Sequence, residues 1–140
     1  MEKPVIPELL LHHISYPVRD VETSASFYES LFGLRRLSRP PIPIPGVWLG
    51  CGDREIHLVY SPDGTYRDGK PADFTDVHFA FWTGDFDGMV ARLERAGFSA
   101  NLPEGDLKGM LILREGISGF PQLYVLDPDR NTIEINAAPM

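Results

Sequence analysis

Two stretches of the chain decide its fold: residues 10–33, LLHHISYPVRDVETSASFYESLFG, and residues 76–97, DVHFAFWTGDFDGMVARLERAG. In each stretch a histidine stands seven residues before an aspartate, and a glycine follows that aspartate after 12 or 13 residues. Self-similarity of this kind has to be recognised before any local motif is interpreted. The sequence therefore predicts that one structural unit is built twice.

Within each copy the pattern predicts a β-strand followed by a capped α-helix. Asp20 and Asp85 suit the N-cap position, because a carboxylate accepts hydrogen bonds from the free N–H groups at a helix start. Gly33 and Gly97 suit the left-handed conformation that follows many helix ends. The apolar residues between these caps recur at helical spacing, so we expect them to face the core: Phe27, Leu31, Phe86, Val90 and Leu93.

After each helix the pattern changes to short strands separated by turns. We expect these strands near residues 47–51 and 55–60 in the first copy, and near 110–114, 122–126 and 132–135 in the second. The polar, turn-rich segment 61–75 links the two copies. The sequence thus predicts one α+β domain of two βαβββ modules, residues 9–60 and 76–137.

Composition excludes several classes of function. The formal net charge of −7 argues against nucleic-acid binding, which needs clustered Lys and Arg to neutralise phosphates. No apolar run approaches the roughly 20 residues that span a bilayer, and the N-terminus does not resemble a signal peptide. A single cysteine, Cys51, excludes an internal disulfide and is typical of a reducing cytoplasm, so we expect a cytoplasmic protein.

Strand parity places four polar residues opposite the apolar faces, since alternate side chains point to opposite sides of a sheet. We expect Leu10 and Ile14 to face the core in the first strand, and Val77, Phe79 and Phe81 in its counterpart. The candidate ligands then share the other face: His13, His57, His78 and Glu134.

Each module supplies one candidate ligand from its first strand, His13 or His78, and one from its last strand, His57 or Glu134. Any one of these residues alone is typical of a hydrogen-bonded polar residue, but their matched parity favours a joint site. Imidazole and carboxylate are ligands for Zn, Ni, Fe, Mn or Co. His12 has the opposite parity, and we interpret it as a structural or surface residue, with an exchange of roles with His13 as the alternative.

With these residues placed, the chain resembles the vicinal oxygen chelate superfamily, which includes glyoxalase I, methylmalonyl-CoA epimerase, extradiol dioxygenases, and fosfomycin- and bleomycin-resistance proteins. The resemblance lies in the repeat stretch HISYPVRDVETSASFYESLFGL, in EIHLV (55–59), in HFAF (78–81) and in QLYVLDPDRNTIEI (122–135). It implies that the two modules enclose a curved trough, and that the four candidate residues bind one divalent metal ion.

Two positions depart from the pattern of that superfamily. Glyoxalase I-like members often carry Glu or Gln where this chain has His57, which keeps a metal-binding side chain but argues against assignment to glyoxalase I itself. Arg130 stands where Gly is usual in the sequence DPDGN, which is a turn. Small members commonly dimerise, so we expect a homodimer, with metal ligands that come from one chain or from two.

The first functional hypothesis is a lyase or isomerase that binds a small oxygenated substrate, such as a glutathione hemithioacetal, through the metal. Glu134 is then both a ligand and the base that shifts a proton through an enediolate-like intermediate. The second is an extradiol-type Fe(II) dioxygenase, for which a subset of two histidines and one carboxylate suffices. The third is a non-catalytic protein that binds a drug or metabolite.

Overall fold

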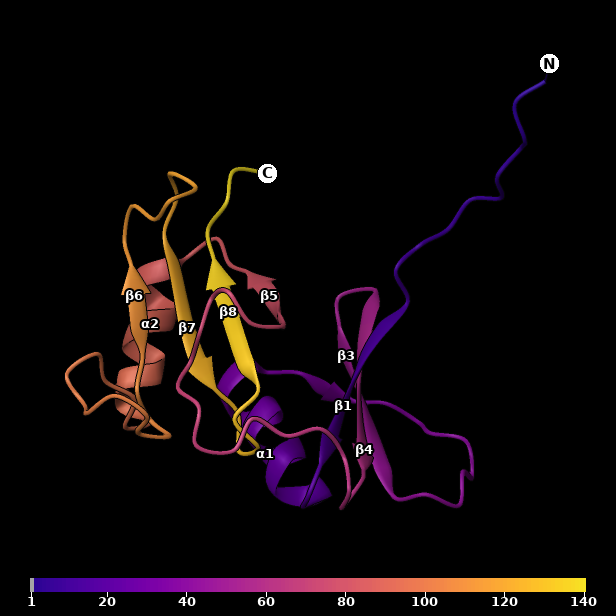
Figure 1. Cartoon of the computed structure of the whole chain (residues 1–140), viewed down its shortest axis with the longest axis horizontal. Coiled ribbons are helices and arrows are strands. Elements are labelled where there is room, and N and C mark those ends of the chain that lie inside the picture. The colour runs from indigo at the N-terminus through magenta and orange to yellow at the C-terminus, as the bar shows by residue number, and fades with distance from the viewer. Residues whose placement is uncertain (1) are drawn as a thin grey trace.

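In the computed structural model, which describes residues 2–140, eight strands form two sheets of four (Figure 1). The first sheet has the order β1-β4-β3-β2 and the second the order β5-β8-β7-β6. The first comprises β1 (His13–Val18), β2 (Arg35–Arg36), β3 (Gly46–Cys51) and β4 (Arg54–Tyr60). The second comprises β5 (His78–Trp82), β6 (Leu111–Leu113), β7 (Gln122–Leu126) and β8 (Thr132–Asn136).

The two sheets have the same topology, which confirms the predicted α+β fold with two βαβββ units. In each sheet the first strand of the unit pairs in parallel with the last, and the remaining pairs are antiparallel. Parallel pairing requires a crossover between the paired strands, and a helix lies in each crossover. Because β1 and β5 stand at sheet edges, each exposes one unpaired backbone edge.

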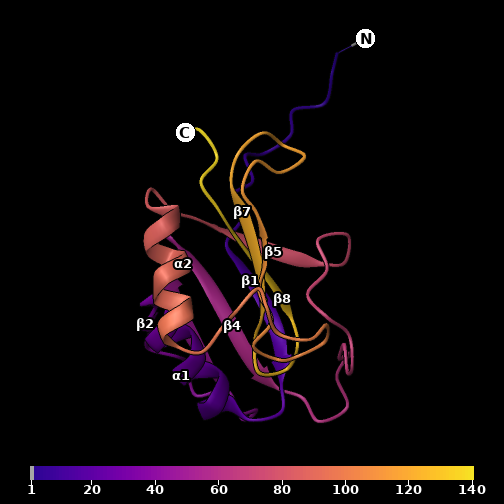
Figure 2. The same cartoon turned by 90° about the vertical axis from the view of Figure 1, so that its left-hand side faces the viewer.

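The helices are α1 (Val21–Phe32) and α2 (Phe86–Arg95), which lie on one side of the strands in Figure 2. Asp20 and Asp85 cap them as predicted. Each side chain accepts a hydrogen bond from the backbone N–H three residues later in the chain, at 2.9 Å for Asp20 and 3.0 Å for Asp85. Gly33 takes the left-handed conformation (φ 67°) and donates its N–H to the carbonyl of Glu29. Gly97 follows α2 with φ 96°. Among residues 2–140, no helix is long and apolar enough to cross a membrane.

The helices and the inner faces of both sheets share one hydrophobic core. Tyr28 from α1 and Leu93 from α2 are fully buried in it, together with Leu58 from β4 and Ile133 from β8. Arg92 ties the helices together by donating hydrogen bonds to the carbonyls of Ser30 and Leu31 at the end of α1. The two units are therefore packed as one domain.

The prediction that Leu10 and Val77 face the core is wrong. Both residues precede the strands, and their exposed fractions are 71% and 72%. Pairing of β1 with β4 begins at His13, and pairing of β5 with β8 begins at His78. Strand alternation does not predict side-chain orientation before these positions, because the backbone there is not paired in a sheet.

A buried carboxylate, Asp127, joins the two units at the turn between β7 and β8. It accepts hydrogen bonds from the Tyr28 hydroxyl (2.7 Å), from the backbone N–H of Asp129 (2.9 Å), and from the backbone and side-chain amides of Asn131 (both 2.9 Å). Burial raises the pKa of Asp127, and the hydrogen bonds from Asn131 and Tyr28 act in the opposite direction. Arg130 completes this turn in the left-handed region (φ 67°), a conformation that glycine adopts more easily than other residues.

We expect Tyr28→Phe to destabilise the protein by about 1–3 kcal/mol, because a buried carboxylate loses a donor. Burial makes Asp127 bind its proton more tightly in the folded state than in the unfolded chain. Protonation of Asp127 therefore contributes to the free energy of unfolding at low pH, and this contribution is lost as the pH rises through the folded pKa. The missing hydroxyl stabilises only the ionised form, so the loss should be larger at neutral than at mildly acidic pH. Urea unfolding at both pH values measures the loss of stability. Tyr60→Phe is the control, because the side chain of Tyr60 is 41% exposed. Equal losses in the two variants would contradict the assigned role.

Candidate metal centre

The first two candidate ligands, His13 on β1 and His57 on β4, lie side by side on the first sheet. The register pairs Ser15 with His57, so these imidazoles share one face. Their rings stack with centroids 3.9 Å apart, and the indole of Trp48 stacks on the other side of His57 at 4.2 Å. His57 is consequently buried, whereas His13 is exposed at the edge of the sheet.

Two further polar residues lie beside this pair and were not among the predicted ligands. Glu55 lies two residues before His57 and therefore on the same face, as strand parity indicates, and its carboxylate is 2.9 Å from Nε2 of His57. His12 has the opposite parity, yet its Nδ1 lies 2.9 Å from Nδ1 of His13, because it stands just before the strand and is free to turn. Parity thus identifies the position of Glu55, whereas it does not predict the contact of His12 with His13.

The charges of this cluster favour neutral imidazole at His13. Loss of hydration lowers the pKa of His13, and repulsion from His57 and His12 lowers it further, against a smaller opposing effect of Glu55. The hydrogen bond with His57 holds the pKa of Glu55 below its usual range. A neutral imidazole is the form that binds a metal, so less proton release has to accompany binding at His13.

The second pair, His78 on β5 and Glu134 on β8, lies on the second sheet in the same arrangement. The register pairs Ala80 with Glu134, just as it pairs Ser15 with His57. Ala80 and Ser15 each lie two residues after the histidine of the first strand, so the two units have the same register. Nε2 of His78 lies 3.1 Å from Oε1 of Glu134. This internal symmetry is the feature that the sequence repeat predicts.

The hydrogen bonds around His78 define which of its ring nitrogens a metal could bind. Nδ1 of His78 lies 2.8 Å from the backbone carbonyl of Asp76, which can only accept, so Nδ1 carries a proton. Nε2 then either carries a second proton and donates it to the carboxylate of Glu134, or, in the neutral ring, presents a lone pair there. Two acceptors at 3.1 Å require a proton or a cation between them. That separation also allows both atoms to bind one ion at the ~2.0–2.2 Å typical of zinc.

Glu134 is buried among hydrogen-bond donors. Its Oε2 accepts from Nδ2 of Asn136 at 2.7 Å and from Nε2 of Gln122 at 3.4 Å. Burial on its own raises the pKa of Glu134, but the hydrogen bonds from Asn136, Tyr124, Gln122 and His78 together outweigh it, and the pKa lies below its usual range. The residue is thus held as a carboxylate, the form in which it binds a metal.

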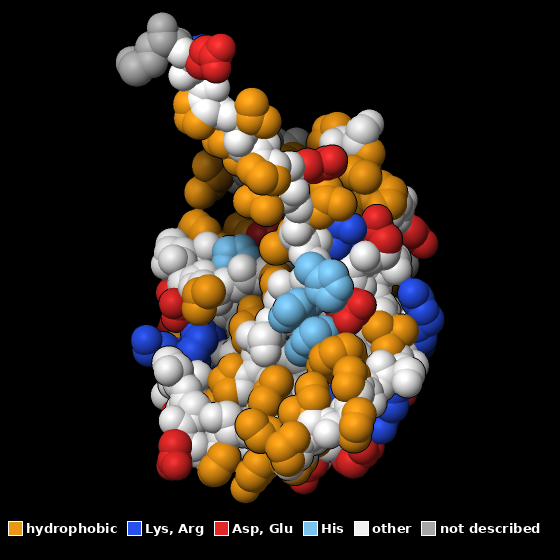
Figure 3. Space-filling view, turned by 90° about the vertical axis from the view of Figure 1, so that its right-hand side faces the viewer, with side chains coloured by type: hydrophobic (Ala, Val, Ile, Leu, Met, Phe, Trp, Pro, Cys, Tyr) orange, Lys and Arg blue, Asp and Glu red, His pale blue; other side chains and the backbone are white. Residues whose placement is uncertain are grey.

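The four predicted ligands come together as two pairs and not as one group. Within residues 2–140, no three His, Cys, Asp or Glu side chains are arranged to hold a metal ion in a single chain. Figure 3 shows histidine side chains at two separate places on one face of the molecule, consistent with pairs on different sheets. Each pair offers only half of the predicted ligand set.

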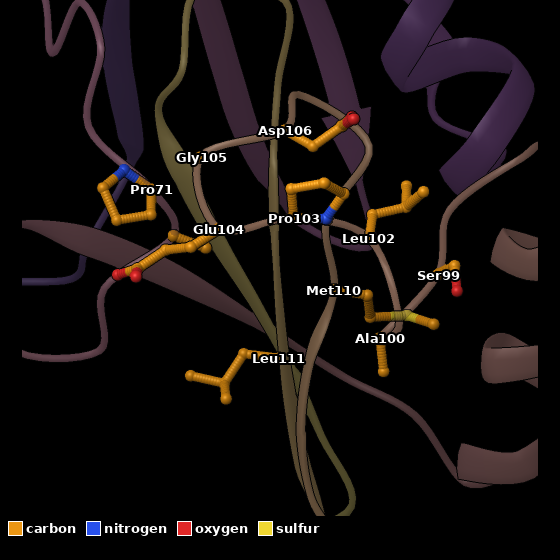
Figure 4. Close-up of a pocket in the computed structure, with 12 residues that line it drawn as sticks. Pro71, Ser99, Ala100, Leu102, Pro103, Glu104, Gly105, Asp106, Met110 and Leu111 are labelled. Carbon is orange, nitrogen blue, oxygen red and sulfur yellow. The ribbon is translucent and has the colours of Figure 1, made fainter.

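The cavities of the chain do not mark a separate candidate site. The pocket of about 310 Å³ in Figure 4 lies between the segment before β5 and the loop before β6, and none of the four candidate ligands lines it. Its wall includes Glu104, Asp106 and Met110. A smaller pocket of about 210 Å³ adjoins His13 and Glu55, and its other wall includes Phe79 and Ala80 of β5.

Comparison with known proteins places this geometry in a family. The model of the Glyoxalase/Bleomycin resistance protein/Dioxygenase superfamily matches residues 10–135. The chain is 28% identical over 130 residues to Glutathione transferase FosA from Serratia marcescens, covering 93% of this chain and 82% of the relative. It is 30% identical over 127 residues to Glyoxylase I 4 from Arabidopsis thaliana, covering 89% and 68%.

A solved structure shares the fold. A mutant of the fosfomycin resistance protein FosX from Listeria monocytogenes, in complex with Mn(II) and 1S,2S-dihydroxypropylphosphonic acid, superposes with a TM-score of 0.67 at 13% identity, covering 97% of this chain and 95% of that chain. The family match spans nearly the whole chain and includes both units of the repeat. The chain therefore belongs to the Glyoxalase/Bleomycin resistance protein/Dioxygenase superfamily.

Proposed function

We propose that this protein is a metal-dependent lyase or isomerase that acts on a small oxygenated substrate. The observation that carries the proposal is the pair formed by His78 and Glu134, in which Nε2 of the imidazole faces a carboxylate oxygen at 3.1 Å while Nδ1 is held by a backbone carbonyl. A divalent cation satisfies both groups, and the stacked pair His13 and His57 supplies the same ligand chemistry from the other unit. Ni, Zn, Co and Mn suit these donors in this type of reaction.

We infer that the complete site forms between two subunits of a homodimer. Each chain carries its two pairs on different sheets, so a site with three or four ligands needs the first sheet of one subunit to face the second sheet of the other. Edge strands β1 and β5 carry His13 and His78, and unpaired edges favour association with another chain. A two-fold axis would then create two equivalent sites per dimer.

The residues have unequal roles in this proposal. When bound, the metal supplies Lewis-acid polarisation of adjacent substrate oxygens. The three histidines hold their positions through stacking and hydrogen bonds and act only as ligands. Glu134 is the catalytic residue, and its second oxygen, Oε2, accepts a proton from the substrate carbon beside the polarised oxygen once it is released from its hydrogen-bond donors. Its low pKa makes it a weak base until it loses some of the hydrogen bonds from Asn136, Tyr124 and Gln122.

The family comparisons support this reaction class and suggest a second candidate. A relative named lactoylglutathione lyase supports a lyase reaction, for which a glutathione hemithioacetal is the proposed substrate. The relative named glutathione transferase favours, as the alternative, addition of a thiol to a substrate held at the same site. Incubation of the metal-loaded protein with glutathione and either an α-ketoaldehyde or an epoxide distinguishes the two by product analysis.

Metal content separates the proposed lyase from the remaining members of the superfamily. Purified protein that contains or takes up Ni, Zn, Co or Mn supports the lyase or isomerase. Oxidisable Fe(II) that supports catechol cleavage would instead identify a dioxygenase. Purification without metal and no binding of Ni²⁺ or Zn²⁺ on titration would leave a non-catalytic drug-binding protein.

Mixing two ligand variants tests whether the site is shared. We expect His13→Ala and His78→Ala each to lower Ni²⁺ affinity by at least about tenfold, since even residues that only orient ligands are worth roughly 10–100-fold. After subunit exchange, a mixed dimer of the two variants contains one site with every ligand intact. Calorimetric titration of the mixture should therefore recover high-affinity binding. Glu115→Ala, at an exposed carboxylate in the loop between β6 and β7, is the control. No recovery in the mixture would rule out a site shared in this way.

The donors around Glu134 give a second test, carried out in metal-free protein. We expect Asn136→Ala to raise the pKa of Glu134, because the donor at 2.7 Å stabilises the carboxylate. Titration of the carboxyl carbon of Glu134 by NMR measures the change. Asn101→Ala, in the exposed turn after α2, serves as the control. A pKa that stays the same or falls in Asn136→Ala would contradict the role assigned to these hydrogen bonds.

A further inference from the structure

The first residues of the chain form an arm, defined here as residues 2–12, that leaves the body of the molecule. It contains no helix or strand and points away from both sheets (Figure 1). Figure 3 shows hydrophobic side chains along it, standing clear of the rest of the surface. Its five large apolar side chains are 68–95% exposed: Val5, Ile6, Leu9, Leu10 and Leu11. An apolar segment that its own chain leaves uncovered is typical of an interaction surface.

The arm begins at the candidate metal centre. The carbonyl of His12 accepts a hydrogen bond from the backbone N–H of Glu55 at 3.2 Å, so the chain is held to the first sheet up to this residue. The next residue, His13, is a candidate ligand, and the three leucines directly precede the histidines. An extended chain rises about 3.3 Å per residue, so Leu9–Leu11 lie within roughly 13 Å of His13 along the backbone.

The matching apolar surface lies beside the other first-strand ligand, His78. Val77 directly precedes His78 and is 72% exposed, and Phe74 in the segment before it is 41% exposed. Both precede the edge strand β5, which begins at His78. The ring of Phe74 lies 6.1 Å from that of Tyr124 within its own chain, and its exposed side together with Val77 leaves an apolar surface next to the candidate ligand His78.

A shared metal site brings these two surfaces together. If His13 of one subunit and His78 of the partner subunit bind one ion at ~2.0–2.1 Å each, their ring nitrogens lie within about 4 Å of each other. The residues that precede them, Leu9–Leu11 on one chain and Val77 on the other, then converge from both sides. The arm contains Pro4 and Pro7, which lack a backbone N–H, so contact through side chains suits it better than strand addition.

We propose that the arm crosses to a second copy of this chain and packs Leu9–Leu11 on Val77 and Phe74 of the partner subunit, closing the dimer over the metal centre. This inference rests on the proposed shared site. It makes the arm an interaction surface with a defined partner, and it links dimer stability to the occupancy of the metal site. Each dimer would contain two such contacts, related by the two-fold axis.

The first experiment measures the dimer dissociation constant by analytical ultracentrifugation, with and without Ni²⁺. The variant carries Leu9→Ser, Leu10→Ser and Leu11→Ser, and we expect its dissociation constant to rise by at least about tenfold. Because these side chains are exposed in the single chain, the monomer fold should be unaffected, which circular dichroism checks. Ile117→Ser, at an 87% exposed apolar residue in the loop between β6 and β7, is the matched control. An unchanged dissociation constant in the triple variant would overturn the proposal.

The second experiment asks which chain the arm contacts. In a Cys51→Ser background, chains with Leu10→Cys are mixed with chains that carry Val77→Cys and then oxidised gently. We expect the mixture to give more disulfide-linked dimer than either variant alone. A chain that carries both changes and closes a disulfide within itself at high dilution would show that the arm folds back on its own body, and would overturn the proposal.

The outcomes of these experiments distinguish failure of the proposed arm contact from failure of the proposed shared metal site. If arm variants weaken the dimer while the mixed ligand variants recover no metal binding, the arm contact stands and the shared site fails. If the mixed variants recover binding while the arm variants leave the dissociation constant unchanged, the shared site stands and the arm contact is wrong.

Discussion

The parallel pairing of the first and last strand in each unit is the constraint on which the rest of the structure depends. It sets β1 beside β4 and β5 beside β8 with the same register offset. That offset brings His13 against His57 and His78 against Glu134 without any further loop or helix. The helices contribute by occupying the crossovers that parallel pairing requires, and by covering the apolar faces, so that the opposite faces are free to carry polar groups.

The two pairs differ chemically although they are equivalent in the fold. On the first sheet an aromatic stack of Trp48, His57 and His13 holds two imidazoles close together. On the second sheet, hydrogen bonds fix one tautomer of His78 and keep Glu134 ionised. The two halves of the repeat are therefore unequal, because the first pair consists of two imidazoles and the second of an imidazole and a carboxylate. We interpret this difference as the origin of a directional site, in which the base lies on one wall.

In the proposed dimer, docking with a second copy accounts for the occurrence of polar ligand pairs and exposed apolar residues together at the edges of the sheets. The exposed leucines adjoin the pair of His13 and His57, and exposed Val77 adjoins the pair of His78 and Glu134. Both features are satisfied if the first sheet of one subunit faces the second sheet of the other. The hydrophobic core shared by both sheets within each chain fixes how the two candidate pairs are placed relative to each other.

The sequence by itself determined the repeat, the capped helices, the strand order within each unit and the face on which each candidate ligand lies. These are local properties, governed by residue spacing, turn chemistry and the two-residue period of a strand. Local reasoning failed at Leu10 and Val77, where the strand pattern continues but the pairing does not. It also missed the contact of His12 with His13, because a residue just outside a sheet does not obey its parity. Only the tertiary structure decided that the four ligands form two pairs, since the placement of one sheet relative to the other depends on how the helices and the shared core pack between them.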